Sequence, residues 1–139
     1  MGRALTVEAD GGSRGNPGVA GWGAVVRDRV TGAVLHEGCA PLGKASNNVA
    51  EYTAVIRGLE RAHELGATDV LLRSDSQLLI NQLTGRYRVK TPHLQPLHRR
   101  VRQLAARFDA IEFEHVRRER NTEADRLANE GVDSWLAAR

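Results

Sequence analysis

The spacing of the apolar residues changes near residue 46, and this change most limits what the chain can fold into. Before it lie three short strand-like runs separated by glycines, over residues 5–10, 19–28 and 33–40. Apolar and polar residues alternate in the first run, as in a strand with one buried face. From Asn47 to about Leu65 the apolar residues recur at helical spacing instead. The pattern therefore predicts an antiparallel meander followed by a helix.

After that helix the pattern predicts a strand, two helices, a second strand and a last helix. A continuous apolar run over residues 70–72 is typical of a central strand covered on both faces, and residues 77–83 suit a short helix. Helical spacing returns over 94–108, residues 111–116 predict the last strand, and Asn121 suits the N-cap of the terminal helix. The resulting order, βββαβααβα, is that of an α/β protein.

Length and composition favour one globular domain over residues 1–139. The chain is 41% apolar and 27% charged, and no apolar run approaches the ~20 residues of a membrane span, so we expect no membrane role. The first residues lack the features of a signal peptide, which favours a cytoplasmic location. The single cysteine, Cys39, excludes an internal disulfide and a zinc site of paired thiolates, and we expect it to be buried.

Arginines gather in two stretches, residues 86–107 and 117–126, although the formal net charge is only +3. Such stretches favour an anionic partner, because surfaces rich in Lys and Arg attract phosphate backbones. Solvated helix faces explain the charge pattern equally well. The charge pattern alone therefore does not decide between a nucleic-acid partner and solvated helix faces.

Four acidic residues are candidates for a common site: Asp10, Glu51, Asp75 and Asp125. A helix between two strands forms a crossover that places the strands side by side and parallel, which would bring Asp10 and Asp75 together at carboxyl ends of strands. Glu51 shares a helix face with small residues, which suggests close packing on the sheet, and Asp125 borders the apolar face of the last helix. Both can therefore point inward.

Each acid also has a structural interpretation, as a turn residue, a helix cap or a partner of a helix dipole. That interpretation weakens for the set, because four carboxylates at one end of a sheet repel each other unless cations neutralise them. Carboxylate oxygens suit Mg²⁺ or Mn²⁺, and a pair of such ions can activate water and stabilise the leaving oxygen in phosphodiester hydrolysis. The acids therefore point to metal ions and to phosphate chemistry.

The segment from Asp10 to Gly18 holds four glycines in nine residues, so its backbone amides could approach an extended ligand closely. A plain hairpin loop is the structural alternative. The segment is not a phosphate-binding P-loop, because it lacks the Gly-Lys-Ser/Thr ending and precedes a strand.

In combination these segments closely resemble ribonuclease H type 1. The resemblance spans nearly the whole chain, and its segments are Asp10-Gly-Gly-Ser-Arg-Gly-Asn-Pro-Gly, Gly21-Trp-Gly-Ala-Val-Val, Asn47-Asn-Val-Ala-Glu-Tyr, Ser74-Asp-Ser-Gln and Asn121-Thr-Glu-Ala-Asp-Arg-Leu-Ala-Asn. It implies a five-stranded mixed sheet flanked by helices, in a metal-dependent endonuclease that cuts the RNA strand of an RNA/DNA hybrid.

The resemblance further implies that Asp10, Glu51, Asp75 and Asp125 hold two Mg²⁺ ions, with Mn²⁺ as a substitute. By analogy Asp10 would bridge both ions, Asp125 would help hold the ion that activates the attacking water, and Glu51 with Asp75 would help hold the other. The products would carry 5′-phosphate and 3′-hydroxyl ends. The implied partner is an RNA/DNA hybrid, and because no obligate protein partner is evident we expect a monomer.

Several polar and glycine positions resemble the residues with which the family contacts the groove of the hybrid. Amide side chains both donate and accept hydrogen bonds, which suits a ribose 2′-hydroxyl and the base edges of a minor groove. Capping and turn formation are the alternative for these residues, and Asn47 in particular could cap its helix. The positions are Gly11, Gly12, Ser13, Asn16, Asn47, Asn48 and Gln77.

The chain departs from the family pattern in the loop before the terminal helix, where many members carry a histidine. Residues 117–120 contain none. The loop resembles that of compact relatives, which implies that Arg118 takes over that neighbourhood. Arginine stays protonated, so it could stabilise phosphate charge but is a poor general base. His115, at the end of the preceding strand, is favoured as a structural residue.

The second departure is the absence of the basic handle, an inserted helix that grips the DNA strand in many bacterial members. The link over residues 85–94 is short. Arg86, Arg88 and Lys90 could make a reduced phosphate contact, with Tyr87 as a stacking surface, although a solvated loop is an equally good interpretation. Weaker, strongly salt-dependent binding is expected.

Two other functions compete with this one. The first is a hybrid-binding module that has lost catalysis, against which the retention of all four acids argues, because clustered negative charge has little use without a metal. The second is another nuclease on the same fold. The amide pair Asn47 and Asn48 and the glycine segment favour hybrid cleavage over it.

Overall fold

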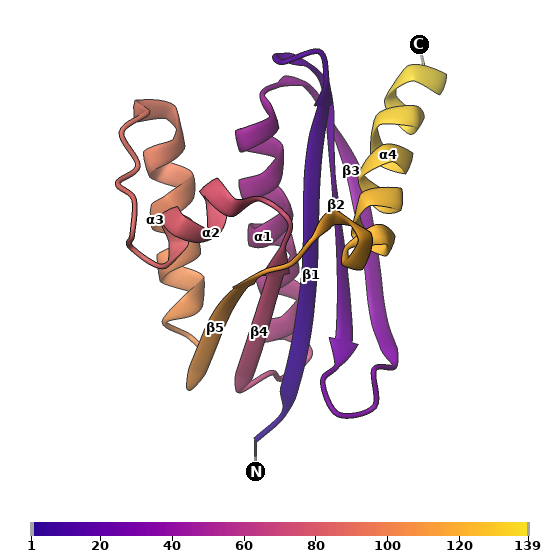
Figure 1. Ribbon diagram of the computed structural model, residues 1–139. Coiled ribbons are helices and arrows are strands. Elements are labelled where there is room, and N and C mark those ends of the chain that lie inside the picture. Colours follow the sequence, from indigo (N-terminus) through magenta and orange to yellow (C-terminus); the bar gives the residue numbers. More distant parts are fainter. Residues whose placement is uncertain (1, 139) are drawn as a thin grey trace.

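The computed structural model describes residues 2–138 and contains five strands and four α-helices (Figure 1). Their order confirms the predicted βββαβααβα arrangement. In chain order the elements are β1 (Ala4–Arg14), β2 (Gly18–Asp28), β3 (Val34–Ala45), α1 (Asn47–Glu64), β4 (Asp69–Ser74), α2 (Gln77–Leu83), the 3-10 turn η1 (Pro92–Leu94), α3 (Gln95–Ala105), β5 (Ala110–His115), the 3-10 turn η2 (Arg118–Arg120) and α4 (Thr122–Ala137).

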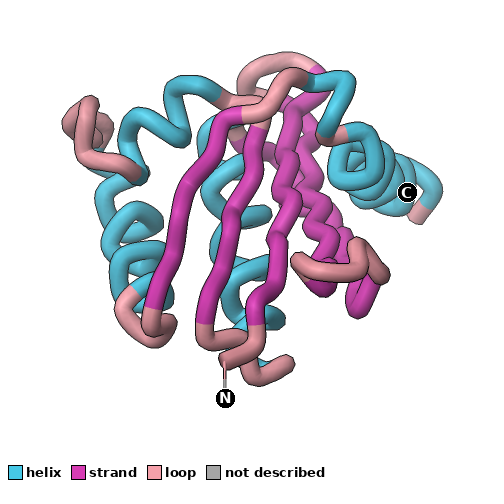
Figure 2. The backbone as a smooth tube through the Cα atoms, turned by 60° about the horizontal axis from the view of Figure 1, so that its bottom comes forward, coloured by secondary structure: helices cyan, strands magenta, loops and turns pink. Residues whose placement is uncertain are grey.

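The strands form one mixed sheet in the order β3-β2-β1-β4-β5. The meander β1-β2-β3 is antiparallel, whereas β4 pairs in parallel with β1, and β5 pairs in parallel with β4. Helix α1 makes the crossover from the meander to β4, as the sequence predicted, and β1 and β4 are therefore direct neighbours. Helices lie on both sides of the sheet (Figure 2).

The two helices that carry acidic residues cover opposite faces of the sheet. A Cβ atom on Gly23 would lie 2.5 Å from the carbonyl oxygen of Ala124 in α4, whereas a Cβ atom on Gly58 of α1 would lie 3.5 Å from the Cβ of Ala24. Since neighbouring residues of a strand point to opposite faces, α4 packs on the Gly23 face and α1 on the Ala24 face. The missing side chain at Gly23 lets α4 approach the sheet closely.

The hydrophobic core lies mainly between the sheet and α1, with α3 packed beside α1. Tyr52, Leu59, Leu72 and Leu104 are at most 1% exposed, and burying each such side chain contributes about 1.5–3 kcal/mol. The helical stripe predicted for residues 47–65 is confirmed, because its apolar members form the buried face. No helix within residues 2–138 combines the length and apolar character that crossing a bilayer requires.

Several local predictions are wrong. Strand β1 runs to Arg14, beyond the predicted end at Asp10, because the glycine segment pairs with β2 up to the Arg14 and Val19 pair. Cys39 is exposed, not buried, because it lies on the edge strand β3. Of the two interpretations left open for Asn47, capping of α1 is excluded, because the N-cap is Ser46, whose side chain accepts a hydrogen bond from the Val49 amide.

Candidate active site

The four predicted acids line one cavity of about 460 Å³. Its wall includes the residues where the chain leaves β4 for α2 and those where it enters α4. Its lining also contains Arg118 and four of the predicted substrate-binding positions. The lining residues are Asp10, Gly11, Gly12, Ser13, Arg14, Asn47, Glu51, Asp75, Ser76, Arg118, Asp125, Ala128, Asn129 and Val132.

Strand register brings Asp10 and Asp75 together. Glu8 of β1 pairs with Arg73 of β4, and each aspartate lies two residues beyond its member of that pair, on the same side of its strand. The sequence predicted that Asp10 ends β1, but Asp10 pairs with Gly23 within the β1-β2 ladder. The strand that ends beside Asp10 is β4, whose last residue is Ser74, and the parallel pairing of β1 with β4 ends with the Glu8 and Arg73 pair.

The remaining two acids enter from the helices. Gly11 lies so close to α1 that a Cβ atom there would stand 2.2 Å from the carbonyl carbon of Ala50, the residue before Glu51. Glycine at this position therefore allows the first turns of α1, and with them Glu51, to reach the cavity. Gly11 faces α1, so Asp10 faces the opposite side, where Asp125 stands in the first turn of α4.

The crowding of acids strongly perturbs their protonation. Burial, the charge of Asp75, a hydrogen bond to Asp125 and the charges of Asp125 and Glu51 together raise the pKa of Asp10 from 3.8 to about 8. Burial also raises the pKa of Glu51, although a hydrogen bond from Ser76 opposes the shift. The Asp10 carboxyl therefore holds a proton at neutral pH unless a cation replaces it.

Asp75 experiences opposing influences. Burial raises its pKa above 3.8, while the guanidinium of Arg118 and a hydrogen bond from Asn121 lower it. Arg118 thus acts on the acids from the turn η2, in the position that the sequence predicted. Its charge would lie beside any phosphate that enters the cavity.

The donor set suits hard divalent cations, because it consists of carboxylate oxygens in one partly buried cavity. Within residues 2–138, however, no group of three or more His, Cys, Asp or Glu side chains is arranged so that it could hold a metal ion. The neighbouring Asp125 instead helps to keep the Asp10 carboxyl protonated, because it raises the pKa of Asp10. The residues fit Mg²⁺ or Mn²⁺ in chemistry, and coordination requires their side chains to turn so that the carboxylate oxygens converge.

The glycine segment and the start of α1 form the neighbouring wall of the cavity. The Asn47 side chain accepts a 2.7 Å hydrogen bond from the Ser13 amide, and the Asn16 side chain accepts one of 3.2 Å from the Asn47 amide. These bonds tie the segment to α1, so both asparagines have a structural role. Gly12 has open space around it, with no atom within 4 Å of a Cβ built there.

Six predicted substrate-binding residues do not line this cavity: Asn16, Asn48, Gln77, Arg86, Arg88 and Lys90. Asn48 is half-buried. Gln77 is exposed, and its side-chain nitrogen donates a 3.4 Å hydrogen bond to the side-chain oxygen of Asn81. Arg88 lines a second cavity, between the link that follows α2 and helix α3, whereas Arg86 and Lys90 are exposed. The structure therefore separates these basic residues from the acids.

Sequence reasoning missed Arg14, Ser76 and Asn129, which line the cavity, and the role of Asn121. Asn121 is the predicted N-cap of α4, but its side chain makes no capping bond there. It is 1% exposed, and its amide nitrogen donates a 3.0 Å hydrogen bond to the carbonyl oxygen of Ala9. Its place four residues before Asp125 could have indicated this role, because residues four apart lie on the same face of a helix.

Comparison with known proteins defines the class of this fold and site. The model of the reverse transcriptase-like family matches residues 8–131. A bifunctional protein of Mycobacterium tuberculosis is 49% identical over 130 residues, which cover 94% of this chain and 36% of that protein. The chain thus spans about a third of the length of this relative.

Two solved structures narrow the class. The N-terminal RNase H domain of the Mycobacterium tuberculosis protein, solved as a fusion with maltose-binding protein, superposes with a TM-score of 0.94 at 47% identity, over 98% of each chain. LC11-RNase H1, solved in complex with an RNA/DNA hybrid, gives a TM-score of 0.89 at 39% identity, over 95% of this chain and 99% of that one. This chain belongs to the ribonuclease H type 1 family.

Proposed function

We propose that this protein is an endoribonuclease that hydrolyses the RNA strand of RNA/DNA hybrids and leaves 5′-phosphate and 3′-hydroxyl ends. The observation that carries the proposal is the convergence of Asp10, Glu51, Asp75 and Asp125 on one cavity, in a chain that belongs to the ribonuclease H family. The hybrid bound to LC11-RNase H1 supports the choice of substrate. Because one chain supplies all four acids, a monomer suffices.

The four carboxylates would hold two Mg²⁺ ions, or Mn²⁺, with Asp10 shared between both ions, Asp125 on one, and Glu51 and Asp75 on the other. Such ions, when bound, make water nucleophilic and stabilise the leaving oxygen. To bind them, the Asp10 carboxyl must release the proton that it holds up to a pH of about 8. Metal loading should therefore be coupled to proton release.

The other residues of the cavity position the substrate. Arg118 would stabilise negative charge on the scissile phosphate, and because arginine stays protonated it does not serve as the base. The backbone of Gly11, Gly12 and Ser13 forms a wall without bulky side chains, which leaves room for a sugar-phosphate strand. Asn47 keeps this wall in place through its bond to Ser13.

The test is the cleavage of an end-labelled RNA/DNA hybrid beside matched RNA/RNA and DNA/DNA duplexes, with Mg²⁺, with Mn²⁺ and with EDTA. We expect the RNA strand of the hybrid to be cut only with a divalent ion, and Asp10→Asn to abolish cutting. Hybrid binding without cutting under either ion would instead favour the alternative of a binding module. Cutting of both DNA strands would indicate another nuclease of the same fold.

A further inference from the structure

Two arginines line the acidic cavity, and they differ in their partners. Arg118 lies near Asp75, where its charge works against the rise in the pKa of that carboxyl. Arg14, the last residue of β1, instead forms a 2.8 Å ion pair with Asp133 of α4, a residue that does not line the cavity. The charge of Arg14 is therefore held by an acid outside the group of four.

The Arg14 side chain is also connected to the start of α4. The side-chain oxygen of Asn129 accepts a 3.4 Å hydrogen bond from the Arg14 guanidinium, and its nitrogen donates a 3.0 Å bond to the carbonyl oxygen of Asp125. Residues four apart lie on one face of a helix, so Asp125, Asn129 and Asp133 form a row. At 1.5 Å per residue, this row places the partners of Arg14 about 6 and 12 Å along α4 from Asp125.

The backbone of Arg14 is fixed, whereas its ion pair is open to solvent. Arg14 pairs with Val19 at the end of the β1-β2 ladder, which fixes the point from which the side chain extends. The side chains of Arg14 and Asp133 are 46% and 63% exposed. Water and salt screen such a pair, so it contributes little to stability. Another anion can therefore replace Asp133 at the guanidinium with little cost to the fold.

A phosphate group is a stronger partner for Arg14 than Asp133 is, because arginine makes paired, charge-assisted hydrogen bonds to phosphate oxygens. A strand that occupies the acidic cavity meets Arg14, since this residue lines the same cavity. The phosphates of one strand follow one another about every 3.4 Å along a duplex axis. The place of Arg14, one to two helical turns from Asp125, therefore assigns it to a neighbouring phosphate and not to the one that is cut.

We infer that Arg14 leaves Asp133 when the hybrid binds and contacts a phosphate of the cut strand near the scissile one. Asp133 thus competes with the substrate for Arg14 and weakens substrate binding. This inference rests on the proposed function, since it takes the hybrid as the ligand. Removal of the arginine and removal of the acid should change affinity in opposite directions, whereas a purely structural tie between β1 and α4 would make both changes harmful.

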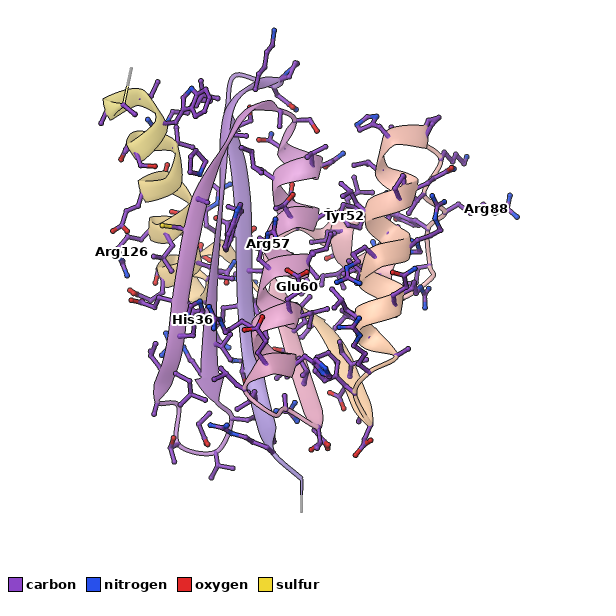
Figure 3. All side chains as sticks on the ribbon, turned by 180° about the vertical axis from the view of Figure 1, so that it is seen from behind. His36, Tyr52, Arg57, Glu60, Arg88 and Arg126 are labelled. Carbon is purple, nitrogen blue, oxygen red and sulfur yellow. The ribbon has the colours of Figure 1, made fainter. Side chains whose placement is uncertain are left out.

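The test compares Arg14→Ala and Asp133→Asn, each with a matched control. Arg57→Ala removes an arginine of α1 that pairs with an acid three residues later, on the opposite face of the sheet from α4 (Figure 3). Glu130→Gln removes an acid from α4 itself, where Glu130 pairs with Arg126. Binding of an end-labelled RNA/DNA hybrid in EDTA, which prevents cutting, is measured by fluorescence anisotropy over a range of salt concentrations.

We expect Arg14→Ala to bind about tenfold more weakly than Arg57→Ala near about 0.1 M salt, with a salt slope lower by about 1. Asp133→Asn should bind about threefold more tightly than Glu130→Gln, which is the size expected of an exposed ion pair. When Arg14→Ala is already present, Asp133→Asn should have no larger effect than Glu130→Gln. In cleavage assays the KM should change in the same directions, while kcat stays unchanged.

Hybrids with single neutral methylphosphonate groups, placed along either strand, locate the contacted phosphate. A neutral group at one RNA-strand position near the cut should weaken binding by the wild type and leave binding by Arg14→Ala unaffected. Sensitivity confined to phosphates of the DNA strand would overturn the inference.

Equal affinity of Asp133→Asn and Glu130→Gln would also overturn it, as would equal affinity of Arg14→Ala and Arg57→Ala. Weaker binding by both Arg14→Ala and Asp133→Asn would show that the pair is only a structural tie. If the wild type binds the hybrid but does not cut it, the proposed function fails, and the exchange at Arg14 still stands on the opposite signs of the two variants. Circular dichroism spectra establish that all variants are folded.

Discussion

The side chain of Asn121 donates a 3.0 Å hydrogen bond to the backbone carbonyl oxygen of Ala9, between residues that are 112 positions apart. Ala9 precedes Asp10, and Asn121 precedes Asp125 by one helical turn, with its own carbonyl oxygen accepting the Asp125 amide at 3.1 Å. The side chain of Asn121 also lowers the pKa of Asp75. One buried residue therefore ties the strand that carries Asp10 to the helix that carries Asp125.

This relationship predicts that Asn121→Ala lowers both stability and kcat. Loss of the buried bond to Ala9 should reduce the free energy of unfolding by about 1–3 kcal/mol, measured by urea denaturation. Tyr52→Phe is the control, because it removes a buried 2.7 Å bond to Gln82 away from the cavity. Both variants should lose stability, but only Asn121→Ala should lose kcat, and equal kcat values would contradict the positioning role.

Asp10→Asn should stabilise the metal-free protein at pH 8. A carboxyl whose pKa rises on folding, here from 3.8 to about 8, favours the folded state below pH 4, and this contribution is lost as the pH rises to 8. In EDTA the wild type should therefore lose a few kcal/mol of stability, on the order of the linkage for such a shift, between pH 4 and 8. Asp10→Asn should flatten this dependence, whereas the exposed Glu112→Gln should not; identical pH profiles for wild type and Asp10→Asn would refute the explanation.

With divalent ions present, the wild type should gain stability and Asp10→Asn should not. Mg²⁺ or Mn²⁺ at a hundredfold excess over its Kd at pH 8 should stabilise the wild type by about 2.7 kcal/mol. The same ion concentration should stabilise it less at pH 6, because binding requires loss of the Asp10 proton and the Kd is therefore higher there. Asp10→Asn and Asp75→Asn should show little gain. The readout is Tm by differential scanning fluorimetry, with Ca²⁺ for comparison, and an ion-independent Tm in the wild type would remove the metal from the proposal.

Two neighbouring glycines should respond oppositely to alanine. Gly11→Ala places a Cβ atom 2.2 Å from the Ala50 carbonyl carbon and should destabilise the fold by about 1–3 kcal/mol or more, because backbone must move. Gly12→Ala meets nothing within 4 Å and should leave the free energy of unfolding unchanged. Thermal unfolding of the two variants side by side measures the difference. Equal Tm values would show that α1 does not approach β1 so closely.

Arg118→Ala should lower kcat by about a hundredfold and leave stability unchanged. Arg118 is exposed in the turn η2, so little packing is lost, but the positive charge beside Asp75 disappears. Arg117→Ala, in the same segment but outside the cavity, is the matched control. Arg118→Lys should recover only part of the activity, because lysine lacks the planar pair of donors. Full activity in Arg118→Ala would exclude a role in phosphate binding.

Local patterns predicted the regular elements well where burial imposes a period. Glu51 was placed inward because it shares its helix face with Ala54, Gly58 and Ala62, and these small residues are indeed buried. The apolar run over 70–72 became part of a central strand. The spacing of apolar residues in the sequence indicates which side of a helix or strand is buried.

Predictions failed where a residue's environment depends on a distant partner. The continuation of β1 past Asp10 depends on pairing with β2, and the exposure of Cys39 depends on β3 being an edge strand. The choice of Ser46 over Asn47 as the cap of α1 also follows from tertiary ties, since Asn47 bonds to Ser13. Such pairings follow from the assembled sheet.

The sequence by itself determined the order of the elements, the four acids and the family, because these follow from local periods and from motifs in order along the chain. Only the tertiary structure decided that burial and the neighbouring acids raise the pKa of Asp10, that Asn121 bonds to Ala9, and that two arginines of α3 line one cavity with Arg88. The reason is physical. Charge interactions and hydrogen bonds act over a few ångströms, and packing of the whole sheet and its helices sets the distances between residues far apart in the chain.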